Sequence, residues 1–425
     1  MATSRILQMF KIPDLRKKIF FVLLLFVVFR IMSTIPIPGV DAQNIQQFFD
    51  RFKVFSFMNV FSGGALSNIS IAMLGLGPYI TAIIIFELLT LIFPSLQKMY
   101  KQEGEAGRKK FNQYARMATV PLAAIQAYAM LGLFQKQGAI SIDSPITMIT
   151  SVIVITAGSI LLMWLGELIT EKGIGNGVSL LIFAGIVARL PISIGESLSK
   201  WTSSQLPSYL LFLASVFVII FGVVLITEAR RNIPVSYAKR VRGMRMYGGT
   251  STYLPMSVNP AGVIPIIFAM SILYIPGMIA NILGQSAGWF GNVAKSVSFF
   301  LEKGLAQGII YFVLVFVFTF FYTMVTFDPK SISENLQKMG GFVPGIRPGP
   351  STAHFIKFIL HRVLFIGALF LSLMAVLPSI IQGLTGITSF GFLIGGTSVL
   401  IVVSVVLDTI KQINAQLQMR EYETI

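Results

Sequence analysis

The chain has 425 residues, a formal net charge of +16, and a composition in which 55% of residues are hydrophobic and only 12% are charged. Soluble domains typically carry about 25% charged residues, so this composition excludes an ordinary soluble domain and indicates an integral membrane protein. The chain has no cysteine, which excludes disulfides and thiolate metal sites.

Ten apolar segments of roughly spanning length follow one another along the chain, and no soluble domain fits between them. The first follows basic residues but no small-residue cleavage site, so we interpret it as a retained span. Helices are expected because lipid offers no partner for backbone polar groups. The sequence therefore predicts an all-α polytopic membrane protein with spans at 19–35, 72–93, 116–134, 147–168, 178–194, 208–227, 261–283, 306–326, 358–378 and 388–408.

Most of the 33 basic residues fall near the two termini and in the loops at 97–116, 228–258 and 328–357. The positive-inside rule places these segments on the cytoplasmic side, and an even number of spans puts both termini there. The last two loops are longer and more basic than orientation requires. Rigid basic protrusions suit an anionic partner, such as RNA phosphate or an acidic protein surface.

One of these loops contains the stretch GGFVPGIRPGPST at 340–352. Proline fixes φ and lacks an amide donor, and glycine costs more entropy to order than other residues. We therefore expect neither a helix nor a central strand here, but a stiff loop that holds Arg347 away from the membrane.

Ten spans divide into two sets of five, residues 1–200 and 201–425, and an odd number per set forces opposite orientations. Inverted repeats of this kind place a pathway at their interface, often marked by Gly/Pro-interrupted spans at matching positions. The second span is interrupted at 75–78 and the seventh at 260–265. The segment before Gly75 is too short and too polar to span. From the residues alone it is an interfacial helix on the exterior side, or one that folds back into the bundle.

Residues for chemistry are scarce. The chain has no HExxH motif, no GxSG motif paired with an intramembrane histidine, and no GxxxxGK[ST] phosphate loop, which argues against a protease or a nucleotide-driven pump. We expect no catalytic residue, metal site or cofactor. The ionisable candidates within or near spans are Arg30, Glu87, Glu167, Glu228 and Asp408. The last three are expected at the cytoplasmic edge, and Arg30 and Glu87 are ambiguous.

Seven stretches spread from the first span to beyond the seventh resemble the bacterial SecY family, the channel subunits of the general protein-secretion translocon. They are IPIPGVD (35–41), MNVFSGGALSNISI (58–71), GPYITAIIIFELLT (77–90), GEAGRKKFNQYAR (104–116), WLGELITEKGIGNGVSLLIFAGIV (164–187), VNPAGVIP (258–265) and GFVPGIRPG (341–349). The resemblance implies an hourglass pore between two inverted five-helix halves, with a lateral gate between spans two and three and spans seven and eight.

The resemblance also implies roles for particular residues, and it favours the folded-back reading of the segment before Gly75 as a short plug helix. The plug would comprise Phe61, Ser62, Gly63, Gly64, Ala65, Leu66, Ser67, Asn68, Ile69 and Ser70. The pore ring would comprise Ile80, Ile84, Ile182, Ile186, Ile267 and Ile401. The lateral gate would carry Thr90, Gln126 and Asn259. The docking surface for a motor or ribosome would carry Arg240, Arg242, Arg245 and Arg347.

From composition alone, isoleucines in such a chain are mostly lipid-facing or core residues. Ile80 and Ile84 are four residues apart and so share a helix face, as do Ile182 and Ile186. An apolar ring could fit any side chain that passes without binding it, and it would resist water and ions by dewetting. Two positions depart from the family's pattern. Met244 interrupts a pair of arginines, which weakens the expected docking contact, and Glu87 stands where some relatives have a neutral polar residue.

The expected function is that of a protein-conducting channel in the bacterial cytoplasmic membrane, which passes unfolded preproteins and releases transmembrane segments into lipid. The resemblance implies SecE-like and SecG-like subunits, the SecA ATPase or the ribosome as driver, and signal peptides as ligands. The alternative is an ion-coupled small-molecule transporter, which would need ionisable groups deep in the membrane.

Overall fold

The computed structural model describes most of the chain: residues 12–38, 41–42, 59, 62–101, 103–142, 144–199, 206–237, 240–242, 245–247, 251–270, 272–273, 296, 304–385 and 396–423. Within these ranges the protein is mainly helical. Each long helix overlaps one of the predicted spans. They are α2 (Pro13–Thr34), α5 (Gly77–Ile92), α7 (Gly104–Lys136), α8 (Pro145–Lys172), α9 (Gly177–Ser199), α10 (Leu206–Glu228), α13 (Gly304–Thr326), α15 (Pro350–Thr385) and α17 (Gly396–Glu423).

Several helices run beyond the apolar segments that predicted them. The helix α7 begins at Gly104 rather than near residue 116, and α17 continues to Glu423. Hydropathy marks only the part of a helix that lipid covers, whereas hydrogen bonding continues through polar residues with good helix propensity. The seventh predicted span is described only at its start, where residues 264–270 are helical.

Within the described ranges, five helices are long and apolar enough to cross a membrane, and the bent pair of α5 and α6 (Pro94–Lys101) would add a sixth. The prediction of an all-α polytopic membrane protein is confirmed. The predicted number of ten spans is not reached by this criterion. The apolar parts of α9 and α10 are too short to pass alone, and most of the seventh segment lies outside the described residues.

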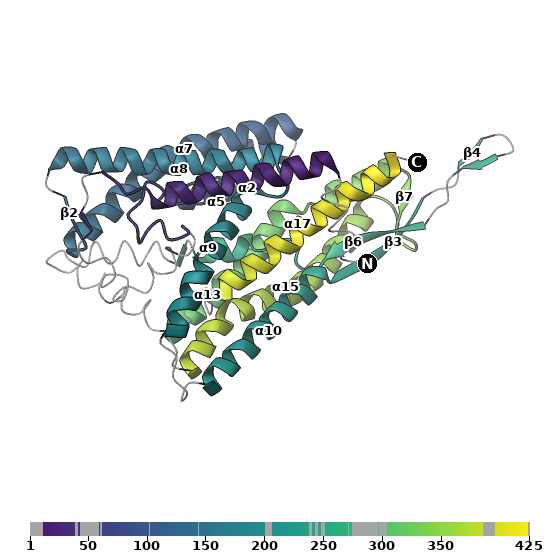
Figure 1. The fold of residues 1–425 in the computed structure, drawn as a ribbon. Helices are drawn as coiled ribbons and strands as arrows, with labels where there is room; N and C mark the ends of the chain where they lie inside the picture. Colours follow the sequence, from purple (N-terminus) through teal and green to yellow (C-terminus); the bar gives the residue numbers. More distant parts are fainter. Residues whose placement is uncertain are drawn as a thin grey trace.

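The helices form two groups (Figure 1). In the first, α7 packs against α5 and α8, and α2 packs against α8. In the second, α15 packs against α10, α13 and α17. The helix α9 joins the groups, because it contacts α8 and α2 on one side and α17 on the other.

A small sheet lies beyond the helical bundle and unites the two long basic loops. The strands β3 (Arg230–Tyr237) and β6 (Ser251–Ser257) pair antiparallel, and β7 (Gly341–Phe342) pairs with the end of β3, giving the order β6-β3-β7. The strands β4 (Arg240–Arg242) and β5 (Arg245–Tyr247) form a separate hairpin at the far end of this loop (Figure 1). A second two-stranded sheet joins β1 (Asp41–Ala42) to β2 (Ile140–Ser141).

The prediction that no soluble domain fits between the spans did not foresee this sheet. The sheet has its own hydrophobic cluster, formed with α14 (Pro329–Lys338) and the first turns of α15. Its buried members are Ile233, Val235, Met256, Leu336, Val343, Ile356 and Leu360. In the stretch 340–352, β7 is an edge strand as proline and glycine require. The prediction that this stretch forms no helix is wrong only for its last residues, because α15 begins at Pro350. Proline is tolerated at the first position of a helix, where its missing amide would have had no partner.

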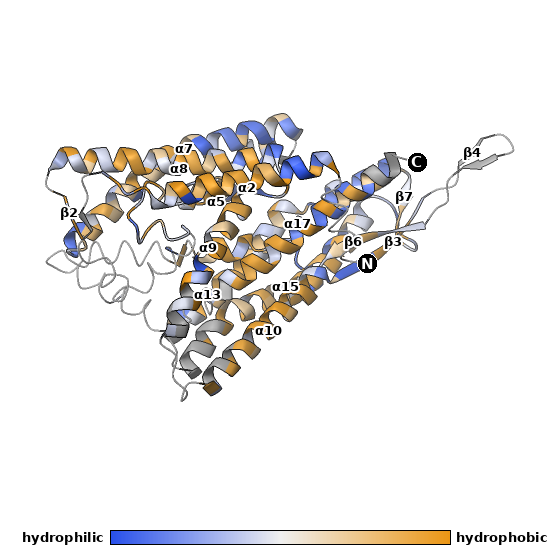
Figure 2. Ribbon diagram, viewed as in Figure 1, coloured by the Kyte–Doolittle hydropathy of each residue, from blue (hydrophilic) through white to orange (hydrophobic). Residues whose placement is uncertain are grey.

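Hydrophilic residues gather at one end of the molecule (Figure 2). The start of α2, the start of α7 and the end of α17 are blue there, on the same side as β3 and β6, whereas the middle of each helix is orange. The chain's basic segments therefore share one end of the bundle, as the positive-inside rule predicts for loops on one side of a membrane.

Candidate functional site

Five of the six isoleucines predicted to form a ring lie in one hydrophobic cluster. Ile182 and Ile186 of α9 and Ile401 of α17 are buried in it, and Ile80 of α5 and Ile267 pack against it. These residues come from both groups of helices. The sixth, Ile84, is buried one turn along α5 in the neighbouring cluster, to which Ile80 also belongs.

The plug segment, defined here as residues 62–70, lies beside this ring. Ala65 is fully buried in the same cluster as Ile182 and Ile401, and Leu66 and Ile69 are buried in a cluster formed by α7 and α8. The segment is therefore enclosed by the bundle and is not an interfacial helix, in agreement with the family resemblance. Phe61 lies outside the described residues.

The plug segment is a run of hydrogen-bonded turns and not the expected regular helix. Gly63 and Gly64 have positive φ angles of 67° and 90°, and Ile69 has a φ of 42°, which is strained for a β-branched residue. The Ser62 hydroxyl accepts the amide of Leu66, and the Asn59 side chain accepts the amide of Ser67. Side-chain oxygens thus accept hydrogen bonds from backbone amides that would donate to backbone carbonyls in a regular helix.

The backbone of the plug segment is tied to the first span. The Arg30 guanidinium of α2 donates to the Gly63 carbonyl at 2.8 Å, and the Asn68 side-chain amide donates to the Ser33 carbonyl at 3.3 Å. A Cβ at Gly63 would lie 3.0 Å from the Gly185 Cα of α9, so a side chain there would push the segment from its seat. These contacts resolve the ambiguity of Arg30, which holds the plug segment. Sequence reasoning missed this because the partner is a backbone carbonyl 33 residues away.

Replacing Arg30 with methionine should loosen the plug segment. A hydrogen bond from a charged donor contributes about 1.5–3 kcal/mol, so the population with the segment displaced should rise roughly tenfold or more. A single Ala65→Cys in this cysteine-free chain reports the change, because its side chain is buried while the segment is seated. The measurement is the rate of labelling by a soluble maleimide. Arg16→Met, which removes an exposed charge from the same helix, should not alter that rate. Equal labelling of both variants would contradict this role.

Three residues are predicted to form a gate. The hydrogen bonds described for Thr90 and Asn259 go to backbone carbonyls and not to another gate residue. The Thr90 hydroxyl donates to the Glu87 carbonyl of its own helix at 2.6 Å, and the Asn259 side-chain amide donates to the Gly262 carbonyl at 3.1 Å. Thr90 and Asn259 are buried, and Gln126 is half-buried on α7. The Asn259 side-chain oxygen is buried without a hydrogen-bond partner among the described residues.

Glu87 of α5 is buried three residues before Thr90, whose hydroxyl donates to its carbonyl. Its side chain is 6% exposed, and Oε2 has no hydrogen-bond partner among the described residues. Ile80, Ile84 and Glu87 are spaced to lie on one face of α5. That face packs in a cluster with Ile266 and Phe268 of the seventh predicted span and Phe318 of α13. The seam between the two groups of helices therefore contains a carboxyl oxygen that has no donor among the described residues.

Glu167 and Glu228, two of the other ionisable candidates, are partnered, whereas Asp408 is exposed within α17. Glu167 of α8 pairs with Arg116 of α7, and Glu228 pairs with Lys411 at 3.0 Å. All four side chains are at least partly exposed. The expected place of Glu167 and Glu228 at the cytoplasmic edge, like that of Asp408, stays a prediction. No group of three or more metal-binding side chains occurs within the part of the chain that the structure describes.

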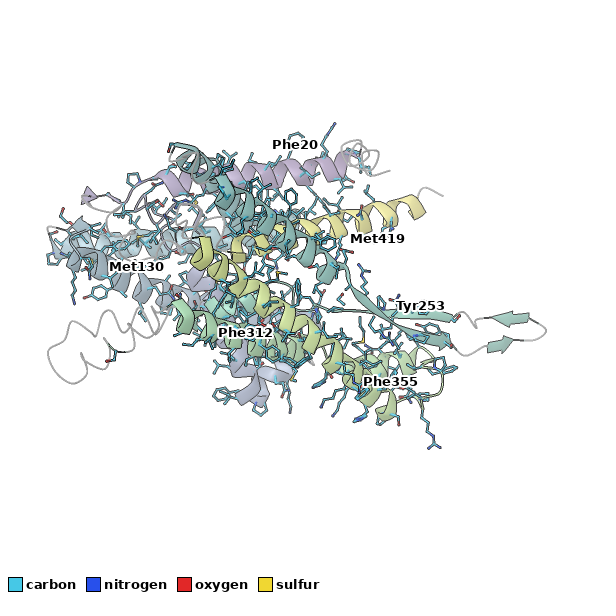
Figure 3. The ribbon with its side chains drawn as sticks, turned by 90° about the horizontal axis from the view of Figure 1, so that it is seen from below. Phe20, Met130, Tyr253, Phe312, Phe355 and Met419 are labelled. Carbon is cyan, nitrogen blue, oxygen red and sulfur yellow. The ribbon has the colours of Figure 1, made fainter. Side chains whose placement is uncertain are left out.

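Arg347 is exposed on a loop that is fixed on both sides. Val343 and Ile346 pack in or against the cluster beneath the sheet, and the Ser333 hydroxyl donates to the Gly349 carbonyl at 2.7 Å. The Arg347 carbonyl accepts from Thr352 at 2.9 Å, so the backbone is held while the guanidinium faces solvent. Figure 3 shows Tyr253 of β6 and Phe355 of α15 at the same end.

The remaining docking candidates lie on the hairpin of β4 and β5. Arg242 and Arg245 are directly opposite in the register, and Arg240 pairs with Tyr247. Only the backbone of these three arginines is described, and Met244 lies outside the described residues. The two docking loops form one surface through the pairing of β7 with β3, which the sequence did not predict.

Comparisons with known proteins place this architecture in a family. A model of the SecY family matches residues 70–410. The protein translocase subunits SecY of Corynebacterium glutamicum and of Streptomyces galbus are 43% and 44% identical to this chain, covering 99% and 97% of both sequences respectively. The Mycobacterium tuberculosis protein of the same name is 42% identical over 99% of both chains.

Solved structures show the same fold. A protein-conducting channel superposes with a TM-score of 0.65, covering 93% of this chain and 91% of that one, at 20% identity. Sec61 from a canine ribosome–channel complex superposes with a TM-score of 0.62 over the same shares of the two chains, also at 20% identity. The family match and the near-complete alignment with bacterial relatives lead to one conclusion: this chain belongs to the SecY family.

Proposed function

We propose that this chain is the channel subunit of a bacterial protein translocase, a multi-pass membrane protein that conducts unfolded preproteins and is not an enzyme. The observation that carries the proposal is the cluster in which Ile182, Ile186 and Ile401 meet Ala65 of the plug segment. Isoleucines from both groups of helices form an apolar constriction there. Such a constriction resists water at rest and contacts a passing chain without hydrogen-bonding to it.

The pathway lies between the two halves, residues 1–200 and 201–425. The packing of the described helices supports this division, because each group packs internally and α9 meets α17 at the boundary. The halves separate laterally where α5 packs with the start of the seventh span and α13. Thr90, Gln126 and Asn259 line this lateral gate, through which transmembrane segments leave for lipid.

Both termini and the sheet lie on the cytoplasmic side. The gathering of hydrophilic helix ends beside the sheet supports this orientation (Figure 2). The united surface of the hairpin arginines and Arg347 then projects toward cytoplasmic partners. A ribosome is one such partner, since solved relatives include Sec61 and Ssh1 complexes with ribosomes. SecA is the other driver, and SecE-like and SecG-like subunits complete the complex.

The transporter alternative is not favoured by the family or by the site. Reconstitution with the small subunits in liposomes tests the choice. Addition of SecA, ATP and a preprotein should give protease-protected preprotein, and no ion gradient should drive solute uptake. Ion-driven solute uptake without SecA, together with no preprotein protection, would overturn the proposal.

A further inference from the structure

Glu87 is a buried acid in the seam between the two halves, and the channel activity described above does not explain it. Its side chain is 6% exposed, and Oε2 has no hydrogen-bond partner among the described residues. An unpaired buried carboxylate is costly, and an intramembrane ionisable residue with no structural partner points to a functional one. A leucine or glutamine at this position would not carry that cost.

The described groups near Glu87 include aromatic side chains. Tyr100 on α6 and Tyr322 on α13 lie near enough for their charges, if ionised, to interact with that of Glu87. The Tyr322 ring meets Phe268 edge to face at a centroid distance of 5.9 Å. Aromatic side chains from both sides of the seam thus lie near Glu87, and opening the seam would separate them.

The described basic residues near this region are engaged elsewhere. The Arg108 guanidinium lies over the Tyr100 ring, 5.9 Å from its centroid. Arg116 forms an ion pair with Glu167, and Lys411 forms one with Glu228. Among the described residues, the seam therefore holds a carboxyl group without a cationic partner, although the chain as a whole carries a net charge of +16.

Glu87 lies close to the cytoplasmic end of the seam. The helix α5 ends at Ile92, five residues later, and is followed by α6 and the basic start of α7. Five residues of helix span about 8 Å, a depth that an extended lysine or arginine side chain can reach from the interface. An apolar segment that enters the seam from this side would bring its flanking cation to Glu87.

We propose that Glu87 is a receptor for the lysine or arginine that precedes the apolar core of an entering signal segment, so that it selects segments with basic flanks. The inference rests on the proposed lateral gate. The closed seam leaves the carboxylate unpaired, and the incoming cation supplies the missing donor. Glu87 then contributes to recognition and orientation, while the ring isoleucines contribute to sealing.

The test compares two reporter preproteins that share one apolar segment but carry either two lysines or two glutamines before it. The channel is reconstituted with its small subunits in liposomes and carries the substitution Leu88→Cys. This is its single cysteine, because the unmodified chain has none. Leu88 is suitable because it packs on the seam face of α5. A cysteine in the first apolar turn of each reporter forms a disulfide with it when bound. We expect roughly tenfold or greater preference for the lysine reporter at subsaturating concentration, the range for a hydrogen bond to a charged group.

The Glu87→Gln variant should reduce this preference to near unity, Glu87→Asp should retain most of it, and Glu87→Lys should favour a reporter with glutamates in the flank. Glu228→Gln, which removes an acid already paired with Lys411, should leave the preference unchanged. Anionic lipid also attracts the lysine reporter, but this attraction is the same for every variant and therefore cancels when the variants are compared. Equal preference in Glu87→Gln and Glu228→Gln would overturn the role of Glu87 while leaving the gate intact. Absence of any disulfide, with both reporters still transported, would overturn the gate assignment and this inference together.

Discussion

Ile401→Asn should make the resting channel leak ions and accept preproteins with defective signal segments. Ile401 is 1% exposed and shares a hydrophobic cluster with Ile182, Ile186 and Ala65 of the plug segment. A buried amide without partners costs about 1–3 kcal/mol, and a side chain that hydrates easily lowers the dewetting barrier of the constriction. The closed state therefore loses stability and its seal. The measurements are resting conductance in planar bilayers and export of a signal-defective reporter in cells.

The matched control is Ile401→Leu, which keeps the ring apolar at nearly constant volume and should cost less than about 1.5 kcal/mol. It should show neither the leak nor the relaxed signal requirement. If asparagine left conductance and reporter export at the level of the leucine variant, Ile401 would be an ordinary core residue and would not belong to the constriction.

Arg347→Glu should abolish most SecA-driven transport without affecting membrane insertion of the channel. Arg347 is exposed on a loop whose backbone is fixed at Val343, Gly349 and Thr352, so docking orders little additional chain. Removing one partner of a docked charge pair typically costs about 2–5 kcal/mol, which weakens motor binding by at least roughly tenfold. The fold should tolerate the change, because exposed substitutions usually shift stability by about 0.5 kcal/mol or less.

This prediction is measured as the SecA concentration that gives half-maximal preprotein import into proteoliposomes. Lys136→Glu makes the same charge change at an exposed position where α7 ends, far along the chain from the docking loops. It should leave the SecA requirement as in the unmodified channel. An unchanged requirement in Arg347→Glu would remove this residue from the docking surface.

The sequence predicted the parts of the fold that rest on local patterns. Apolar runs located the long helices because lipid requires such runs, and spacing by four put Ile80 and Ile84 on one face of α5. The assembly of the ring could not be deduced from spacing. It depends on contacts between residues as distant as Ile80 and Ile401, and only the family resemblance brought them together in advance.

The sheet was missed although part of its signal was present. Ile233 and Val235 are buried in β3 and alternate with the exposed Asn232 and Pro234, which is the period of a half-buried strand. Its pairing with β7 joins residues more than 100 positions apart, and no local pattern specifies that partner. The plug segment was predicted as a helix because serine and two glycines resemble a helix start. The segment instead forms turns with positive φ angles, and these angles go with its close packing against α2 and α9.

The central claim is that a translocating chain passes between the isoleucines of the ring, and the lack of native cysteine allows a direct measurement. A preprotein with one cysteine is stalled midway through channels that carry either Ile401→Cys or Ile153→Cys, the latter on α8 with 61% of its surface exposed. Oxidation should join the stalled chain to position 401 and not to position 153. Disulfides at 153 but not at 401, with transport intact, would contradict a pathway through the ring.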